Sequence, residues 1–496
     1  MKNFKTLIKK SVLLLIIITT SCTSDFDEIN TNPNQATENP SLDLLFSSIM
    51  PGFANQLTSS YEVTGQFAQQ FAIKNSDAGV LRQDDDAISR RFWETVYSEN
   101  NGALRNASFL SFEAEKRGNN DLYQAIGKIY KVYMLSYTTD LFGDIPYTQA
   151  GQAFKISNEN LLPKYDSQKL VYESMLADLE LANDLIANAN ENPNNLSISE
   201  EFDVLFNGDA SKWQKFVNSL QLRLLMRISN VESTGSKIKE ILENPEDYPI
   251  IESIEDEPVF SYNSLVDWSL NPANEDDFNE IRLSATVVNI MKGEGGDNKI
   301  SDVQDTRLAY LLNPTTANTS EFVGQPVGLV SDTAVDAERS LLSENFRNLN
   351  KFWLITAAEI AFIKTEAAHR GFINGSAEDL YIEGVEKSLN RYGLSDNSTY
   401  LADLRTNFSG NEIKHIAIQR WMDQVNNGFE GYAVWRRMNF PVLELGQDVV
   451  ASQIPTRFFY SSKTTDKNQE NADIAINRAP LNGSNLITDK VWWDKE

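Results

Sequence analysis

Two blocks of helical periodicity constrain the fold of this chain more than any other feature of its sequence. Apolar and aromatic residues recur at the i, i+3, i+4 and i+7 spacing of one helix face from Tyr123 to Tyr137 and again from Trp213 to Ile228. Similar patterns occur near residues 42–72, 91–117, 166–188, 351–371, 376–393 and 411–428. About eight helices in pairs predict a mainly α fold of stacked helix-turn-helix repeats of the tetratricopeptide kind, although no clean repeat period is present.

Two of the expected helices also carry residues that start helices. Ser211 with Gln214 forms a capping box at the start of the pattern that contains Trp213. Ser376 with Asp379 caps the pattern at 376–393. We therefore expect these two helices to begin close to Ser211 and Ser376.

The sequence between and after the two blocks is irregular. Gly, Asn, Asp, Pro and Ser divide residues 232–350 into short pieces, and the tail at 441–496 is similar. We expect one domain over 41–496 with little β structure, whose helical scaffold occupies about 41–231 and 351–440. Binding residues tend to lie on long polar loops above a rigid frame, so we expect the irregular parts to form the ligand side.

The N-terminus has the pattern of a secreted leader followed by a tether. Four lysines precede a seven-residue apolar stretch, which is too short to span a bilayer because spanning takes about 20 apolar residues. The next residues resemble a bacterial lipobox, in which the cysteine becomes the lipid-bearing N-terminus, although Thr19 replaces the usual leucine. We expect a lipoprotein signal peptide at 1–21, a lipidated Cys22 and an acidic, Asn-rich tether at 22–40; an unmodified, buried Cys22 is the alternative.

Composition argues against several classes of function. The chain has 44 lysines and arginines against 70 aspartates and glutamates, a net charge of −26, and it lacks a basic stripe, so we expect no binding to nucleic acid. One cysteine and two histidines are too few for a zinc site of Cys and His ligands or a multi-histidine metal centre. A Ser-His-Asp hydrolase would have to use His369 or His415, and both lie in apolar helical patterns.

Several segments resemble one protein family and occur in that family's order. They are "YTTDLFGDIPYTQA" (137–150), "PKYDSQKLVYESMLADLELA" (163–182), "FNGDASKWQKFVNSLQLRLLMRIS" (206–229), "GFEGYAVWRRMNFPVL" (428–443) and "RFFYSSKTTDKNQENADIA" (457–475). Together with the lipoprotein start, this set resembles the SusD/RagB-type nutrient-binding outer-membrane lipoproteins of Bacteroidetes over essentially the whole mature chain. The acidic residues directly after Cys22 are similar to the signal that sends such lipoproteins to the outer face of the outer membrane.

The resemblance implies a helical body with four tetratricopeptide-like helix pairs that works with a SusC-like TonB-dependent transporter. It also implies binding of oligosaccharides, or of peptides in some members, without cleavage and hence without catalytic residues. We expect a neutral glucan such as laminarin or another β-glucan, because an acidic chain with no basic cluster near Trp268 repels uronic acids and sulfated chains. The alternatives are a peptide-binding relative and a surface glycoside hydrolase. The two catalytic carboxylates of a hydrolase are recognised by their separation in space, which a sequence does not show.

Sugar rings stack on exposed aromatic side chains, so the eight tryptophans are the first candidates for a binding site. Trp268 is the strongest candidate because the sequence around it has neither a helical nor a strand period; alternatively, Trp268 packs its loop onto the core. The neighbours whose polar groups suit sugar hydroxyls are Tyr262, Asn263, Asp267 and Asn271.

Trp93 is the second candidate. It opens a predicted helix behind a polar loop with Arg82 and Asp84, and a tryptophan in this part of the chain is similar to one that starch-binding relatives use for stacking; a core position is the alternative. Four other tryptophans lie in apolar helical patterns and are expected to pack in the core: Trp213, Trp353, Trp421 and Trp435. The patterns leave Trp492 and Trp493 undecided.

One loop has ligands suited to calcium. The segment "GEGGDNKISDVQD" (293–305) contains Asp297, Asp302 and Asp305, but their spacing is not that of an EF-hand. A solvated loop is the alternative, so we expect no resident cofactor.

Overall fold

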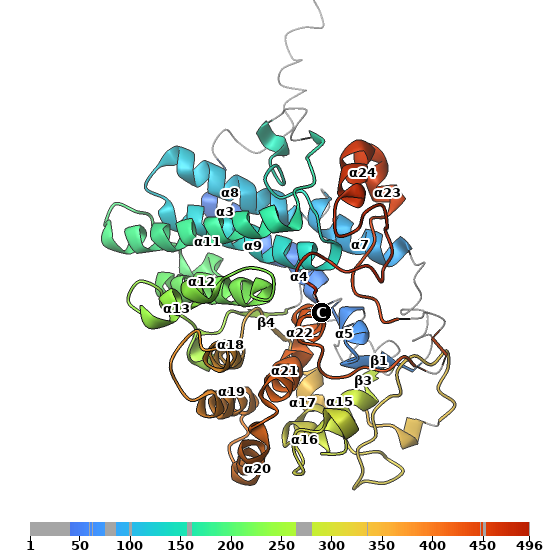
Figure 1. Cartoon of the computed structure of the whole chain (residues 1–496). Coiled ribbons are helices and arrows are strands. Elements are labelled where there is room, and N and C mark those ends of the chain that lie inside the picture. The colour runs from blue at the N-terminus through green and yellow to red at the C-terminus, as the bar shows by residue number, and fades with distance from the viewer. Residues whose placement is uncertain are drawn as a thin grey trace, which may run out of the picture. The chain divides into compact units, whose positions relative to one another are not determined.

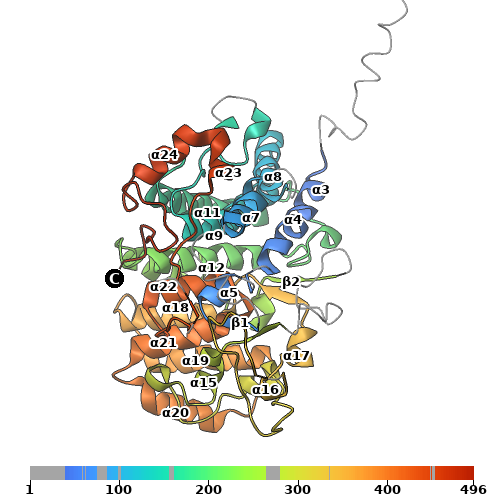
Figure 2. The same ribbon diagram turned by 90° about the vertical axis from the view of Figure 1, so that its right-hand side faces the viewer.

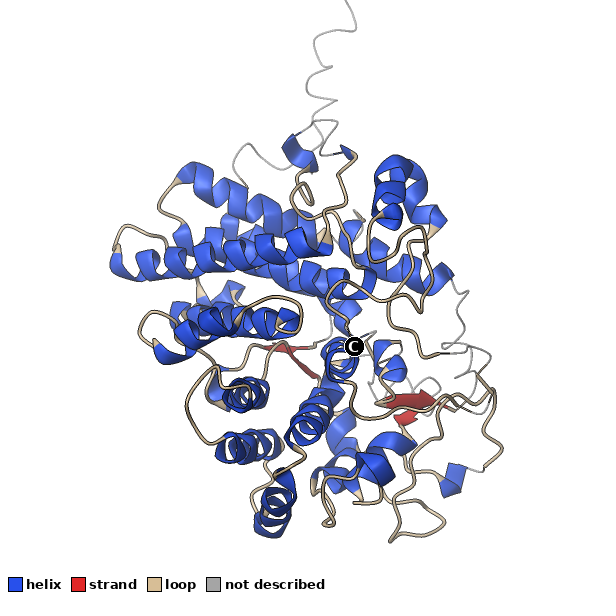
Figure 3. Ribbon diagram, viewed as in Figure 1, coloured by secondary structure: helices blue, strands red, loops and turns tan. Residues whose placement is uncertain are grey.

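Helices make up most of the described part of the chain, and its strands are short (Figure 3). The structure is a computed structural model that describes residues 40–58, 60–61, 63–74, 86–98, 102–155, 161–263, 280–334, 336–446, 448–449 and 453–495. The mainly α fold predicted from the periodicity is confirmed. Leu42–Glu496 form one compact unit.

The first helical block agrees with the sequence patterns where these are longest. Its helices are α3 (Leu42–Ser47), α4 (Ile49–Thr58), α5 (Thr64–Phe67), α7 (Asp86–Tyr97), α8 (Ala103–Arg117), α9 (Asp121–Phe142), α11 (Gln168–Glu191) and α12 (Ala210–Ile228). Helices α9 and α12 contain the two strongest patterns. The pattern near 91–117 is divided between α7 and α8, and Gly102, directly before α8, adopts a left-handed conformation with a φ of 60°. The pattern near 42–72 is divided among α3, α4 and α5 and ends in strand β1 (Phe71–Ile73).

Both predicted helix starts are confirmed, but the capping residue predicted for one of the two helices is wrong. The Ser376 hydroxyl accepts a hydrogen bond from the Asp379 amide (3.1 Å) at the start of α19 (Ala377–Arg391). Helix α12, in contrast, is capped by Asp209, whose carboxylate accepts from the amides of Ser211 (2.9 Å) and Lys212 (3.3 Å). A charged acceptor also interacts favourably with the positive end of the helix dipole, which explains the use of the earlier residue.

The second helical block follows the patterns with two departures. Its elements are α18 (Ala357–His369), α19, α20 (Ser398–Phe408), α21 (Glu412–Asp423), the 3-10 turn η6 (Gln424–Asn426) and α22 (Gly428–Met438). The pattern near 351–371 begins as strand β4 (Lys351–Trp353) before α18 starts. The pattern near 411–428 ends in η6, and α22 then continues the chain as a separate helix.

The two blocks form one continuous stack of helices (Figures 1 and 2). Helix α8 packs on α9, α9 on α11, and α11 on α12; α12 then packs on α18, which is followed by α19 and α20. Helix α21 packs on both α18 and α22. The contact between α12 and α18 joins two helices that are separated by the whole irregular region in the sequence, so this region is an insertion beside the stack.

The insertion and the tail contain short elements only, in the part that the structure describes. These are α13 (Gly235–Glu243), β2 (Val259–Ser261), β3 (Ile281–Leu283), α15 (Ala285–Met291), α16 (Arg307–Leu311), α17 (Glu344–Arg347), α23 (Ser462–Thr465) and α24 (Gln469–Asn477). Further 3-10 turns are η1 (Ala153–Lys155), η2 (Glu200–Phe202), η3 (Ile254–Asp256), η4 (Gly296–Asn298), η5 (Asp336–Glu338) and η7 (Asp466–Asn468). Two antiparallel ladders tie the insertion to the scaffold: β1 with β3, and β2 with β4.

Large aromatic side chains fill the centre of the stack. Trp213 and Trp421 are fully buried, as expected from their patterns, and Trp353 is buried while Trp435 is half-buried. Trp493, which the sequence left undecided, is buried and donates its indole N–H to Asp140 (2.7 Å), so the end of the chain belongs to the core. No helix in the described ranges combines the length and the apolar character that crossing a membrane requires.

Candidate functional site

Most of the residues predicted for the ligand site lie outside the described residues. This holds for Arg82, Asp84, Asp267, Trp268 and Asn271, and also for the predicted lipidation site, Cys22. Their roles stay predictions.

The structure does describe two neighbours of Trp268. Tyr262 is buried, and its hydroxyl donates to the backbone carbonyl of Ala54 in α4 (3.1 Å). The Tyr262 ring therefore packs between the insertion and the scaffold. Asn263 is exposed.

The β1–β3 ladder brings together the ends of the two segments that the sequence proposed for binding. Lys74 ends the described residues before segment 75–85, and its amide donates to the carbonyl of Glu280, the first residue after segment 264–279 (2.9 Å). The Lys74 ammonium (2.7 Å) and the Arg282 guanidinium (2.5 Å) also both bind the carboxylate of Asp336. The two segments are therefore attached to the scaffold at neighbouring points.

Trp93 lies in α7 among other aromatic rings. Its indole is 8% exposed, stacks on Tyr165 at 5.4 Å with an interplanar angle of 14°, and contacts Tyr97 at 4.7 Å. The edge of Phe142 meets it at 5.1 Å. Because other rings cover the indole so closely, Trp93 is the wall of an aromatic cluster and not an open stacking surface.

This cluster borders a cavity of about 370 Å³, which we call the aromatic cavity. Its apolar lining includes Trp93, Tyr97, Leu161, Pro163 and Tyr165, and its polar lining includes Arg105, Gln149, Thr464, Lys467 and Asn468. None of the described residues that line it is an acid, a histidine or a cysteine. A cavity of this size, mostly apolar with a few polar groups, is the usual form of a binding site for a small molecule.

Hydrogen bonds hold the walls of the aromatic cavity together. The Tyr97 hydroxyl donates to the Pro146 carbonyl (2.7 Å), and the Asn468 side-chain amide donates to the Pro163 carbonyl (2.8 Å). Burial raises the pKa of Tyr97 and of Tyr165, so both phenols are neutral at physiological pH. The cavity is thus formed by α7, by the start of α8, by the loops that flank residues 156–160, and by the tail.

The predicted calcium ligands do not form a metal site in the described residues. The Asp305 carboxylate is buried and binds the Arg307 guanidinium through both oxygens, with a distance of 3.0 Å from Nε to Oδ1. Asp302 pairs with Lys299, and Asp297 is exposed. Within the described residues, no group of three or more His, Cys, Asp or Glu side chains is placed to hold a metal ion.

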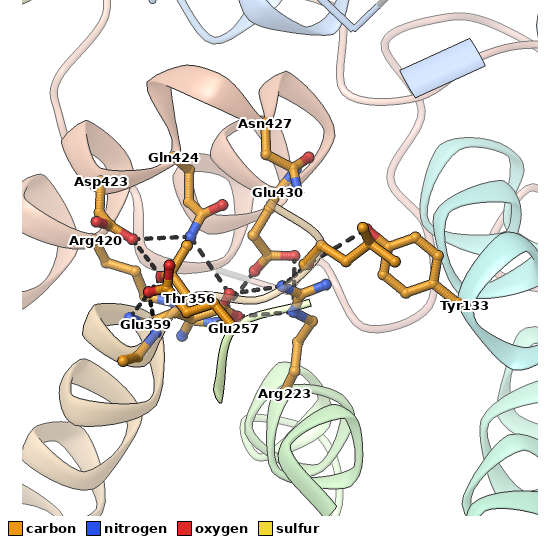
Figure 4. A network of polar contacts seen from close by, with 12 residues as sticks. Tyr133, Arg223, Glu257, Thr356, Glu359, Arg420, Asp423, Gln424, Asn427 and Glu430 are labelled. Carbon is orange, nitrogen blue, oxygen red and sulfur yellow. Dashed lines mark hydrogen bonds and ion pairs between the residues drawn. The ribbon is translucent and has the colours of Figure 1, made fainter. Parts of the chain in front are cut away.

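A network of buried charges, which the sequence analysis missed, joins the helices at the centre of the stack (Figure 4). Arg223 of α12 binds Glu359 of α18 at 2.6 Å, and Glu430 of α22 binds Arg227 at 2.6 Å and Arg420 at 3.1 Å. The side chains of these residues are at most 2% exposed. Each acid faces arginines and not a cavity, so Glu359 and Glu430 are unsuitable as a pair of hydrolytic carboxylates, and the network is structural.

Comparisons with known proteins agree with this architecture. A family model described as "Starch-binding associating with outer membrane" matches residues 33–461. A solved chitin-binding protein is 25% identical, with a TM-score of 0.73, and the match covers 92% of this chain and 99% of that one. SusD-like proteins from Bacteroides uniformis (22% identity, TM-score 0.75) and Bacteroides thetaiotaomicron (21%, 0.74) match over the same shares of both chains. No curated protein matches the chain. Since the family model spans most of the sequence and the fold agrees, the chain belongs to the SusD-like family of starch-binding, outer-membrane-associated proteins.

Proposed function

We propose that this protein is a non-catalytic glycan receptor that is held at the outer face of the outer membrane by lipid on Cys22. It hands its ligand to a SusC-like TonB-dependent transporter. The family match supports nutrient binding at the outer membrane, and the lipobox-like sequence supports the lipid anchor. Several buried acyl chains hold a protein firmly, because each buried methylene contributes about 0.8 kcal/mol.

The aromatic cavity is the observation that carries the proposal. An oligosaccharide end that enters it meets the ring of Tyr97 and the polar groups of Gln149 and Asn468. Contacts with aromatic rings contribute about 1 kcal/mol each, and net hydrogen bonds contribute about as much. A few such contacts give a dissociation constant between micromolar and millimolar, which suits a receptor that must release its ligand.

The ligand we propose is a neutral β-linked glycan. The chitin-binding relative makes chitin oligosaccharides the first probe, beside laminarin as the β-glucan that the sequence favours. The acetamide methyl of each chitin sugar adds an apolar group that suits a lining of rings and prolines.

A binding role without catalysis is supported by the lining of the cavity. Glycoside hydrolysis needs two carboxyl groups about 5 to 10 Å apart, and the described residues of the aromatic cavity supply none. A peptide ligand is the alternative that the binding test must distinguish.

Affinity electrophoresis of the purified protein tests the proposal. Gels that contain chitin oligosaccharide conjugates, laminarin, starch or xylan should retard the protein if it binds that glycan, and a peptide mixture serves as the competing class. Tyr97→Ala should weaken retention about fivefold, the effect of losing about 1 kcal/mol, whereas Tyr97→Phe should keep it. Tyr310→Ala is the matched control, since Tyr310 is also half-buried and its ring contacts that of Tyr392 at 4.8 Å.

Four results would contradict the proposal. Retention by peptides alone would make the protein a peptide receptor, and new reducing ends released from a glycan would make it an enzyme. Equal loss of retention in Tyr97→Ala and Tyr310→Ala would remove the aromatic cavity as the site. If Trp268→Ala alone abolished retention, the site would instead lie on the segment between β2 and β3.

A further inference from the structure

Three lysines surround a second, smaller cavity, although the chain carries a net charge of −26. This cavity has a volume of about 140 Å³ and lies between α8, α9, α11 and the turn η1. We call it the lysine pocket; its lining includes Ser108, Ser111, Lys128, Lys131, Gln152 and Lys155. Two acids also line it, Glu115 and Asp178, so positive charge is in excess.

The charges of the lysine pocket are only partly compensated. The Asp178 carboxylate is shared, since its oxygens lie 2.8 Å from the Lys128 ammonium and 3.8 Å from the Lys131 ammonium. The third ammonium, that of Lys155, donates to the Gln152 side-chain oxygen (2.9 Å) and pairs with no acid in the described ranges. Glu115 is exposed at the edge of the pocket.

Lys131 is the most enclosed of the three lysines. Its side chain is 14% exposed, and its ammonium lies 4.2 Å from the centre of the Tyr147 ring. Burial lowers the pKa of Lys131, and the neighbouring charges of Lys128 and Lys155 act in the same direction, against Asp178 and Asp166. An additional negative charge in the pocket would therefore stabilise the charged form of this lysine.

Two glycines let the segments around the pocket approach one another closely. A Cβ on Gly127 of α9 would lie 2.6 Å from the Ala107 carbonyl oxygen, so glycine allows α9 to approach α8 closely. Gly151 has a φ of 68°, and a Cβ there would lie 2.3 Å from the Ser108 hydroxyl oxygen. The chain after Gly151 therefore crosses close above α8, and this places Lys155 over the pocket.

A hydroxyl without a partner is also present in the lysine pocket. The Ser108 oxygen is buried and makes no hydrogen bond to the described residues. Buried hydroxyls are normally satisfied, so this one lacks a partner that a group bound in the pocket would supply once the Ser108 side chain turns toward it. An oxyanion accepts hydrogen bonds from a hydroxyl and from ammonium groups alike.

We propose that the lysine pocket binds a small oxyanion, such as a sulfate or phosphate group. The cavity volume is far above the roughly 10 to 15 Å³ that admits one water, so a group of five heavy atoms fits. Residues Gly151 and Ala153 line the aromatic cavity, and Gln152 and Lys155 line the lysine pocket, so one short segment separates the two. The anion can therefore be a free ion or a substituent of a sugar. The proposal stands on this pocket alone, whether or not the aromatic cavity binds a glycan.

Calorimetric titration of the purified protein with sodium sulfate tests the proposal, with ionic strength held constant by sodium chloride. We expect millimolar binding that Lys155→Met weakens about tenfold, the effect of losing one charge-assisted hydrogen bond. Lys116→Met is the matched control, because Lys116 lies on α8, is 59% exposed, and binds Glu113 outside the pocket. Equal melting temperatures of the two variants and the parent protein show that folding is intact.

Selenate locates the anion directly, since its anomalous scattering marks its position in a crystal. The expected peak lies within hydrogen-bond distance of the ammonium groups of Lys131 and Lys155. A parallel titration with N-acetylglucosamine 6-sulfate, compared with the unsulfated sugar, shows whether the natural ligand is a free anion or an anionic sugar. Tighter binding than that of inorganic sulfate indicates an anionic sugar. Equal or weaker binding indicates a free ion. Absence of millimolar binding for both anions, or equal weakening by Lys155→Met and Lys116→Met, would overturn the proposal.

Discussion

Replacing Glu430 by glutamine should destabilise the protein far more than any surface substitution of the same kind. The Glu430 carboxylate is 0% exposed and lies 2.6 Å from Arg227, 3.1 Å from Arg420 and 3.7 Å from Arg223. Burial raises the pKa of Glu430, but the three arginines outweigh burial and lower it overall, so the folded state holds the charged form. Glutamine keeps the shape of the side chain and removes the charge, which leaves arginines buried with too little compensation.

The size of the expected loss in the free energy of unfolding follows from these distances and from the burial of the carboxylate. Removing one partner of a buried ion pair costs about 3 to 5 kcal/mol. A compact unit of about 450 residues has an unfolding entropy of about 0.9 kcal/mol per kelvin near its melting temperature, from about 2.1 cal/mol per kelvin per residue. Glu430→Gln should therefore lower the melting temperature by about 3 to 5 °C.

Differential scanning calorimetry at neutral pH measures this change, with Glu383→Gln as the control. Glu383 forms a solvent-accessible pair with Lys387 on α19, at 2.5 Å with side-chain exposures of 44% and 19%, and pairs in contact with solvent contribute at most about 1 kcal/mol. If the two variants shifted the melting temperature equally, the buried network would have no special role in stability and the reasoning would be refuted.

Three further outcomes are expected. The pKa of Glu366 is lowered from 4.5 to about 2, because Arg437 outweighs burial. Since the folded pKa is below the unfolded one, the stability that Glu366 contributes is present above pH 4.5 and is lost as the pH falls toward 2. Urea denaturation should therefore show a flatter dependence of stability on pH in Glu366→Gln than in the parent protein. Burial lowers the pKa of His415 from 6.5 to about 4, so folding favours its neutral form. Urea denaturation should therefore show that the stability of the parent protein falls between pH 6.5 and pH 4, and that the stability of His415→Gln falls less over this range. Cys22→Ala should move the protein from the membrane fraction to the soluble fraction on immunoblots of fractionated cells, and unchanged membrane association would contradict lipidation.

The long helices could be predicted because their apolar residues keep one period over several turns. Helix α9 is 22 residues long, and its pattern leaves no other interpretation. The breaks could not be read in the same way, because a period does not show where a single residue changes conformation. Helix α7 ends at Tyr97 and α8 begins directly after the left-handed Gly102, and Asp209 in place of Ser211 caps α12.

The two cavities depend on contacts that no local pattern reveals. Trp93 meets Tyr165 only through the tertiary fold, and the lysine pocket exists because Gly127 and Gly151 let backbone segments approach. The predicted roles of Trp268 and its neighbours stay untested, since most of them lie outside the described residues.

The buried charges were missed for a related reason. A hydropathy pattern treats arginine as a surface residue, and Arg223 and Arg227 interrupt the apolar positions of α12. They are buried because acids from distant parts of the chain meet them. The partner of a buried charge is a property of three-dimensional packing.

The direct contact between α12 and α18 bears on how this architecture can diversify. Helices α12 and α18 contact each other directly, although the chain inserts about 120 residues between them. The inserted region can therefore vary more than the helices of the stack. Mutations and length changes in its exposed loops, away from the two short ladders and from buried contacts such as that of Arg307 with Gln419 (2.7 Å), spare the interfaces of the stack. One framework can therefore acquire new recognition surfaces while its folding is left to the helices.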